Sequence, residues 1–179
     1  VLNPDQSAES LISRANKVLP AGSFGNMPGD IVLERGKAGR VWDINGTEYV
    51  DFLLGSGPMF VGHAHPDVTK AITEQAPQGT TFFANNQYGI KLAEEICEAM
   101  ACADQLRFVS SGSEATLYAM RLARAYRKRD KILKFEGGYH GMSDYSLMSL
   151  APTRLANYPQ ALPDSAGIPK QVSNEVIIA

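Results

Sequence analysis

The sequence predicts an α/β fold, in which a mostly parallel central sheet with flanking helices follows the N-terminal segment of a smaller α+β domain. Two observations support this prediction. Strand-like, helical and strand-like patterns follow one another between residues 106 and 136, as in a βαβ unit. Nearer the N-terminus, Asn45-Gly46 lies between two strand-like runs, which is a strong signal for a β-hairpin. We expect the change from one organisation to the other near Gly55.

The N-terminal region is expected to begin with a helix over residues 10–19, where apolar side chains recur at helical spacing. Pro20 and Gly22 end this helix and open a loop. A small antiparallel unit then follows. Its strands are predicted at residues 31–34, 41–44 and 47–50.

The rest of the chain alternates between helices and single strands. Helices are predicted from Pro66 to just before Pro77, over residues 88–100 and over residues 114–129. Strands are predicted at residues 106–109, 131–136 and 175–179. Residues 151–170 contain four prolines and no periodicity, so we expect a long loop there, of the kind that is usually functional or mobile.

Composition and charge exclude several classes of protein. The 179 residues include 17 Lys and Arg against 19 Asp and Glu, so the chain lacks the basic balance of a nucleic-acid binder. No apolar run approaches the roughly 20 residues that span a bilayer. Cys97 and Cys102 are too few for a disulfide scaffold, and the first residues resemble neither a signal nor a transit peptide, so we expect a cytoplasmic protein. His63 and His65 have no third ligand at a useful spacing, and we expect no metal site.

The turn Ser111-Gly112-Ser113 joins a predicted strand directly to a predicted helix. Ser111 and Glu114 have the spacing of a capping box. Gly112 allows a ligand to approach the backbone, and the free N–H groups of a helical first turn attract anions, so the turn suits a compact phosphate group. It matches neither the Walker loop nor the three-glycine dinucleotide fingerprint. The alternative is a well-capped helix that binds nothing.

A glycine-rich segment follows the next predicted strand, at residues 135–141. It places Tyr139 and His140 among three glycines. Because ligands bind beyond the carboxyl ends of parallel strands, we expect Tyr139 and the Ser111–Ser113 turn to border one cleft. Taken singly, Tyr139 could be a core aromatic and His140 a structural hydrogen-bonding residue. Together with the turn, they favour a planar phosphorylated cofactor.

With these motifs, the chain resembles the N-terminal part of a class III (subgroup II) aminotransferase, which is a pyridoxal-phosphate enzyme of fold type I. Within that family it is most similar to the glutamate-1-semialdehyde aminomutase branch. The resemblance runs through most of the chain. The matching segments are residues 14–20, 41–46, 51–52, 57–59, 62–66, 107–115 and 134–141. The resemblance to fold type I assigns residues 1–56 to the N-terminal segment of the small domain. It assigns residues 57–179 to the first part of the large domain, which binds the cofactor.

The resemblance also implies roles for individual residues. Gly112 and Ser113, with Ser111 beside them, match the residues that hold the phosphate of pyridoxal 5′-phosphate. Tyr139 matches the aromatic residue that stacks on the pyridine ring, and His140 its supporting neighbour. Phe24, Ser56 and Phe83 match residues that lie near the substrate in the family. Phe83 belongs to a segment that, in the family's homodimer, approaches the active site of the partner subunit. The Schiff-base lysine and the Asp that pairs with the pyridine nitrogen have no counterpart here, and we expect both beyond Ala179.

The family implies an aminotransferase that moves an amino group from an amino acid or amine donor to a keto-acid or aldehyde acceptor by a ping-pong mechanism. Three departures from the aminomutase branch favour this activity. No Arg occurs in residues 21–28, Ser56 stands where that branch places a Trp, and residues 142–145 differ from its usual continuation. Glutamate-1-semialdehyde 2,1-aminomutase is the first alternative. A non-catalytic module that binds a phosphorylated ligand is the second.

Overall fold

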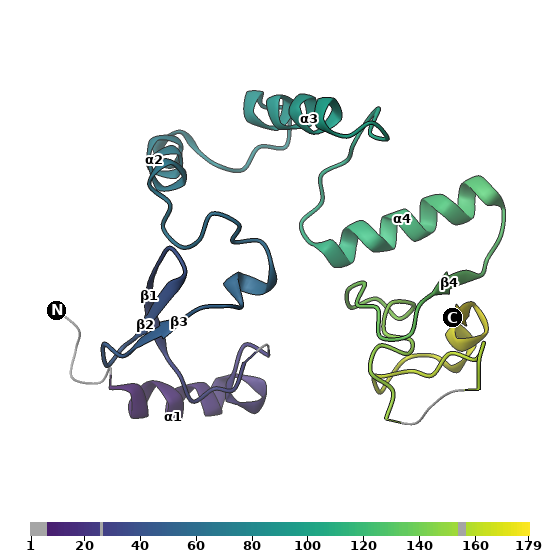
Figure 1. Cartoon of the computed structure of the whole chain (residues 1–179), viewed down its shortest axis with the longest axis horizontal. Helices are drawn as coiled ribbons and strands as arrows, with labels where there is room; N and C mark the ends of the chain where they lie inside the picture. Colours follow the sequence, from purple (N-terminus) through teal and green to yellow (C-terminus); the bar gives the residue numbers. More distant parts are fainter. Residues whose placement is uncertain (1–6, 26, 154–156) are drawn as a thin grey trace. The chain divides into compact units, whose positions relative to one another are not determined.

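The computed structural model describes residues 7–25, 27–153 and 157–179. The chain divides into two compact units, one ending at Asn85 and the other beginning at Asn86 (Figure 1). The domain boundary expected between residues 56 and 57 remains a prediction.

The first unit begins with helix α1, Ala8–Val18. The Ser7 hydroxyl caps it by accepting a hydrogen bond from the Ser10 amide at 3.2 Å. A short 3₁₀ turn, η2 (Pro20–Gly22), follows, and Ala21 within it has a positive φ of 54°. The helix predicted over residues 10–19 is therefore confirmed, with its start shifted to Ala8.

Three antiparallel strands form a sheet in the order β1 (Leu33–Lys37), β2 (Arg40–Asp43) and β3 (Glu48–Val50). The buried carboxylate of Asp43 organises the β2–β3 turn. It accepts hydrogen bonds from the amides of Asn45 and Thr47 at 3.0 and 2.8 Å and from the Tyr49 hydroxyl at 3.1 Å. Burial raises the pKa of Asp43, but these hydrogen bonds outweigh it and hold the pKa below its ordinary value. The predicted hairpin is confirmed.

The rest of the first unit consists of short helical segments. A 3₁₀ turn, η3 (Leu54–Ser56), follows β3, and helix α2 (Pro66–Gln75) continues into η4 (Ala76–Gln78). Pro66 occupies the first position of α2, where its missing N–H costs nothing. This helix confirms the one predicted between Pro66 and Pro77.

The second unit contains helices α3 (Gln87–Ala99) and α4 (Gly112–Arg127), strands β4 (Ile132–Lys134) and β5 (Val176–Ile178), and the 3₁₀ turn η5 (Lys170–Asn174). Strands β4 and β5 are parallel neighbours, with Leu133 opposite Ile177. A small apolar core lies beside them. It consists of Met148, Ala161, Val176 and Ile178, with Tyr145, Ile168 and Val172 packed against it.

The strand predicted at residues 106–109 does not form in the structure, so that prediction is wrong. These residues have no strand assignment, and β4 and β5 pair only with each other among the described strands. A strand needs a hydrogen-bonded neighbour, and the strand propensity of residues 106–109 does not supply one. The parallel crossover in the structure runs instead from β4 through residues 135–175 to β5. The described part of the predicted loop 151–170 contains no strand and no α-helix.

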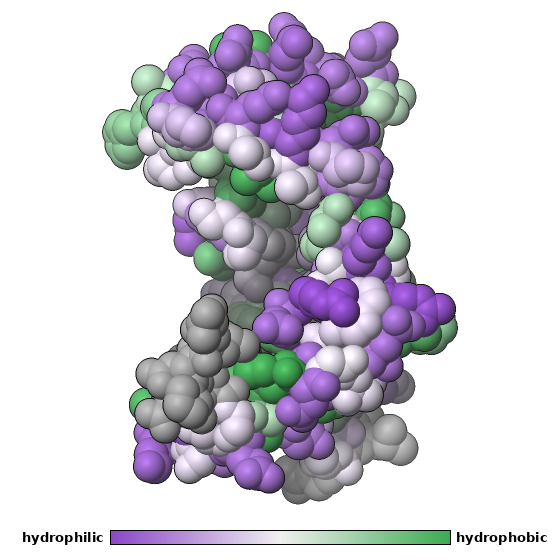
Figure 2. Space-filling view, turned by 90° about the vertical axis from the view of Figure 1, so that its left-hand side faces the viewer, coloured by the Kyte–Doolittle hydropathy of each residue, from purple (hydrophilic) through white to green (hydrophobic). Residues whose placement is uncertain are grey.

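Apolar side chains remain at the surface of both units. The helices α1 to α4 contribute no buried residue within the described parts of the chain. Leu122 and Tyr126 on α4, for example, are 71% and 82% exposed. Figure 2 shows apolar residues among polar ones on one face of the molecule. None of the helices described is both long and apolar enough to cross a bilayer.

Candidate functional site

The N-terminus of α4 has the capped geometry that the sequence predicts. The Ser111 hydroxyl accepts a hydrogen bond from the Glu114 amide at 3.2 Å. The Glu114 carboxylate reaches back and accepts one from the Ser110 amide at 2.8 Å, one residue before the cap. The capping interaction is thus confirmed. It holds the turn in one conformation and places a negative side chain in the first turn of the helix.

The backbone at Gly112 is open to solvent. A Cβ atom built there would meet nothing within 4 Å, so a ligand can approach the chain closely. As the first two helical residues, Gly112 and Ser113 carry N–H groups that have no acceptor within the helix. The hydroxyl of Ser113 accepts a hydrogen bond from the Met142 amide at 3.1 Å, which leaves its own hydrogen free to donate. These three donors fit a phosphate group.

The segment that carries Tyr139 and His140 packs against this turn. The Thr116 hydroxyl, one helical turn further along α4, donates to the His140 carbonyl at 2.6 Å. Gly141 lies so close to Ser113 that an added Cβ atom would stand 2.6 Å from the Ser113 Cα atom. The structure therefore brings Ser113 and the segment at residues 139–142 together.

Tyr139 is 64% exposed and His140 is also exposed. The alternative that Tyr139 is a core aromatic is therefore wrong for the described chain. An exposed ring of this kind offers a flat surface on the segment that contacts the α4 turn. The capped turn and the segment that carries Tyr139 are therefore in contact within one unit.

Lys134 is a buried lysine near this segment that the sequence analysis does not single out. Its side chain is only 6% exposed, and its ammonium donates to the carbonyls of Ser146 and Met148 at 3.0 and 2.5 Å. The Gly137 amide donates to the Ser149 carbonyl at 2.9 Å and ties the glycine-rich segment to the same residues. The only sequence signal was a charged residue inside an apolar strand.

Burial lowers the pKa of Lys134, and the negative charge of Asp164 offsets part of this effect. At pH values just below 10.5, the ordinary pKa of lysine, this residue therefore binds more protons in the unfolded chain than in the folded chain. The contribution of Lys134 to the free energy of unfolding rises with pH in this range. We expect Lys134→Met to remove this rise, as measured by urea denaturation over the alkaline pH range just below 10.5. The exposed Lys131→Met variant is the control, and a Lys134→Met protein with the wild-type pH dependence would contradict the assignment.

The three residues that resemble substrate contacts all lie in the first unit, in separate segments. Phe24 is in the loop after η2, Ser56 ends η3, and Phe83 precedes α3. All three are exposed, and Phe24 is 94% exposed. Their exposure leaves them free to contact a small molecule, but no observation on the first unit alone tests that role.

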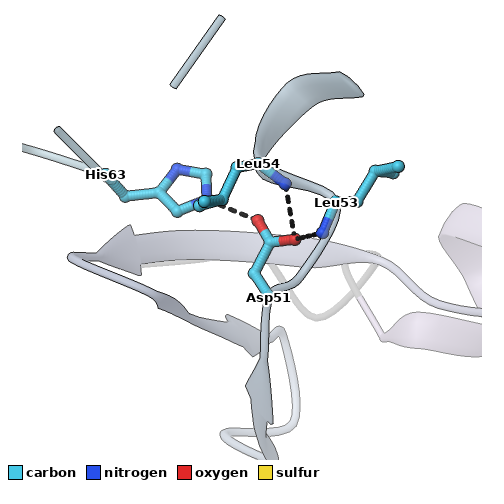
Figure 3. Close-up of polar contacts among 4 residues, drawn as sticks. All are labelled: Asp51, Leu53, Leu54 and His63. Atoms are coloured by element: carbon cyan, nitrogen blue, oxygen red, sulfur yellow. Dashed lines mark hydrogen bonds and ion pairs between the residues drawn. The ribbon is translucent and has the colours of Figure 1, made fainter. Parts of the chain in front are cut away.

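Both histidines of the loop before α2 have structural partners. His63 Nε2 lies 2.6 Å from a carboxylate oxygen of Asp51 (Figure 3). His65 caps α2, since its Nδ1 accepts a hydrogen bond from the Asp67 amide at 3.3 Å. These partners explain why two histidines occur so close together.

One hollow in the second unit lies away from the candidate site. It is a shallow surface depression beside the start of β4 and of β5, lined in part by Arg129, Asp130 and Glu175. The Ser111–Ser113 turn and Tyr139 lie instead beyond the carboxyl end of β4, the edge at which parallel sheets bind ligands. We therefore assign the ligand site from the donors and the exposed ring, and not from the hollow.

Several solved structures of aminotransferases and related enzymes are similar to this chain. An omega-transaminase from Sphaerobacter thermophilus is 33% identical, with a TM-score of 0.86 over 98% of this chain and 42% of its own. A transaminase with PLP bound is 30% identical, with a TM-score of 0.85 over 99% of this chain and 42% of its own. A glutamate-1-semialdehyde aminomutase from Pseudomonas aeruginosa is 25% identical, with a TM-score of 0.74 over 96% of this chain and 38% of its own.

The chain therefore spans about two fifths of the length of these structures. The fold is that of the pyridoxal-phosphate-dependent aminotransferases, as expected. The family model for class-III aminotransferases matches residues 22–174, which include the capped turn and the Tyr139 segment. From this match and these likenesses, we conclude that the chain belongs to the class-III aminotransferase family.

Proposed function

We propose that the full-length protein is an aminotransferase that moves an amino group from an amino acid or amine donor to a keto-acid or aldehyde acceptor by a ping-pong mechanism. Class-III aminotransferases use pyridoxal 5′-phosphate. The observation that carries the proposal is the contact between the open, capped turn at Ser111–Ser113 and the segment that presents Tyr139.

The phosphate end of the site is proposed to consist of Ser111, Gly112 and Ser113. The N–H groups of Gly112 and Ser113 and the hydroxyl of Ser113 donate hydrogen bonds to the anion. The positive end of the α4 dipole adds to the attraction. The Ser111 hydroxyl fixes the turn by accepting a hydrogen bond from the Glu114 amide, and its own hydrogen is still able to donate to the anion.

The ring end of the site is proposed to be Tyr139, with His140 beside it. An exposed aromatic side chain can stack on a heteroaromatic ring and hold its plane. The His140 carbonyl is already bound to Thr116, which fixes the backbone from which both side chains project. When bound, pyridoxal phosphate supplies an electron sink for the bond broken at the substrate carbon. The lysine that moves the proton is predicted to lie beyond Ala179.

On the substrate side we propose Phe24, Ser56 and Phe83. We also propose a cytoplasmic homodimer in which Phe83 approaches the partner's site. The dimer rests on the family resemblance. The location rests on the balanced charge and on Cys97 and Cys102, which form no disulfide in the described chain. Sedimentation of the full-length protein at the dimer mass supports the assembly, and a monomer at enzyme-assay concentrations contradicts it.

The ping-pong proposal predicts two separate half-reactions. Adding an amino donor alone should abolish the visible absorbance of the bound cofactor and release one equivalent of carbonyl product. A carbonyl acceptor added afterwards should restore the absorbance. Absorbance that stays unchanged with every donor in a panel of amines and amino acids would contradict the proposal.

One alternative function is favoured by a specific observation, the likeness to a glutamate-1-semialdehyde aminomutase. An aminomutase converts glutamate-1-semialdehyde into 5-aminolevulinate and needs no separate acceptor. We expect the protein to form no 5-aminolevulinate while it consumes ordinary amino donors. Formation of 5-aminolevulinate without an added acceptor would replace our proposal with the aminomutase.

A further inference from the structure

Asp51 and His63 form a contact in the first unit that the proposed function does not use. Asp51 directly follows β3, and both of its carboxylate oxygens are engaged (Figure 3). Its Oδ1 atom accepts hydrogen bonds from the amides of Leu53 and Leu54, each at 2.9 Å, at the start of η3. Its Oδ2 atom lies 2.6 Å from His63 Nε2. One carboxylate therefore joins the two ends of the segment from residue 51 to residue 63.

His63 is itself anchored to the sheet. Its amide and its carbonyl each form a hydrogen bond with Ala38, in the turn between β1 and β2, at 2.8 Å. Its ring packs on Gly36 so closely that a Cβ atom there would stand 2.6 Å from the His63 Cγ atom. The ring thus has a fixed place from which it can hold Asp51. The side chains of His63 and Asp51 are 24% and 15% exposed, which shields their contact from much of the solvent.

The segment closed by this contact has no hydrophobic anchor of its own. None of residues 52–62 is buried, and its two phenylalanines, Phe52 and Phe60, are 93% and 94% exposed. The backbone is nevertheless in an unusual conformation, since residues 54–57 all have a positive φ. Two of these are not glycine, namely Leu54 at 45° and Ser56 at 65°. Such a conformation persists only where the surroundings determine it.

We propose that Asp51 and His63 are positioning residues, which clamp the base of the segment and thereby fix the backbone of Ser56 for contact with the amino donor. The proposal rests on the proposed function for the role of Ser56, but the clamp itself rests on the contacts of the first unit alone. The hydrogen bond from His63, followed by those from the Leu54 and Leu53 amides, lowers the pKa of Asp51, as expected of a carboxylate held in its charged form.

The test uses the full-length protein with its cofactor and compares His63→Leu with His63→Gln. Leucine removes the donor, whereas the glutamine amide can still donate to Asp51. We expect amide hydrogen exchange at residues 53–57 to accelerate about tenfold in His63→Leu, because a hydrogen bond to a charged group is lost. The KM for the amino donor should rise by a similar factor while kcat changes little, and His63→Gln should restore both values.

Two further variants make the test specific. Asp51→Asn keeps an oxygen for the Leu53 and Leu54 amides but loses the charge. Its exchange rates and its KM should therefore lie between those of the wild type and those of His63→Leu. It also replaces His63→Leu if that variant does not fold. Arg40→Gln removes the exposed ion pair between Arg40 and Glu48 on the same sheet and is the control, with neither exchange nor KM expected to change.

The outcomes separate the clamp from the function on which its role rests. Wild-type exchange rates in both His63→Leu and Asp51→Asn would overturn the clamp. Faster exchange with an unchanged KM would overturn the role of Ser56 in donor binding. A wild-type protein that transaminates no donor would contradict the proposed function, and the positioning role with it, while the exchange rates would still decide whether the clamp exists.

Discussion

Gly141→Ala is expected to destabilise the second unit and to weaken cofactor binding. Gly141 has a φ of 96°, a conformation in which an L-residue is strained. The added Cβ atom would also stand 2.5 Å from the Oγ atom and 2.6 Å from the Cα atom of Ser113. Because one of these is a backbone atom, the segment at residues 139–142 must move away from the α4 turn.

We expect this change to cost about 3 kcal/mol of unfolding free energy, the sum of backbone strain and overpacking. Gly167→Ala is the matched control, because Gly167 also has a positive φ, 88°, but an added Cβ atom would meet nothing within 4 Å. That variant should carry the backbone strain alone, about 1 kcal/mol. Equal losses of unfolding free energy in the two variants, measured by urea denaturation, would show that the close approach of Gly141 to Ser113 does not affect stability.

Tyr139→Ala is expected to weaken the binding of pyridoxal phosphate about 10- to 100-fold, because it removes the area of the ring and its stacking geometry. The free energy of unfolding of the apoprotein should hardly change, since the side chain is 64% exposed and leaves no cavity. This combination distinguishes a binding residue from a core residue. Cofactor titration and urea denaturation of the same apoprotein measure the two quantities.

Two other substitutions sharpen this prediction. Tyr139→Phe keeps the ring and should bind the cofactor nearly as well as the wild type. Tyr158→Ala, an aromatic residue of the same unit that is 59% exposed, should leave cofactor affinity unchanged. An affinity that is the same in Tyr139→Ala and in the wild type would remove Tyr139 from the site.

The parts of the fold that the sequence predicts correctly are those set by local interactions. Ser111 and Glu114 are three residues apart, and their capping contacts form within a single helical turn. The turn at Asn45-Gly46 likewise needs only its own residues and the Asp43 carboxylate. The helices were also predicted to within two residues at nearly every end, because apolar periodicity and caps are local signals.

The features that the sequence does not predict depend on partners far along the chain. Residues 106–109 have strand propensity but no neighbouring strand in the described structure. The burial of Lys134 requires carbonyl groups supplied 12 and 14 residues later. The pairing of Asp51 with His63 depends on the β1–β2 turn at Ala38, which holds the histidine in place. No local pattern encodes such a contact, although the types of residue involved are visible.

The most direct test of the central claim, that the Ser111–Ser113 turn holds the cofactor phosphate, is the affinity of the full-length apoprotein for two ligands, pyridoxal phosphate and pyridoxal. Ser113→Ala should weaken the binding of pyridoxal phosphate about 10- to 100-fold, since it removes a hydrogen bond to a charged group. It should leave the affinity for pyridoxal unchanged. Ser165→Ala, an exposed serine elsewhere in the unit, is the control. Equal affinities of Ser113→Ala and wild type for pyridoxal phosphate would contradict the claim.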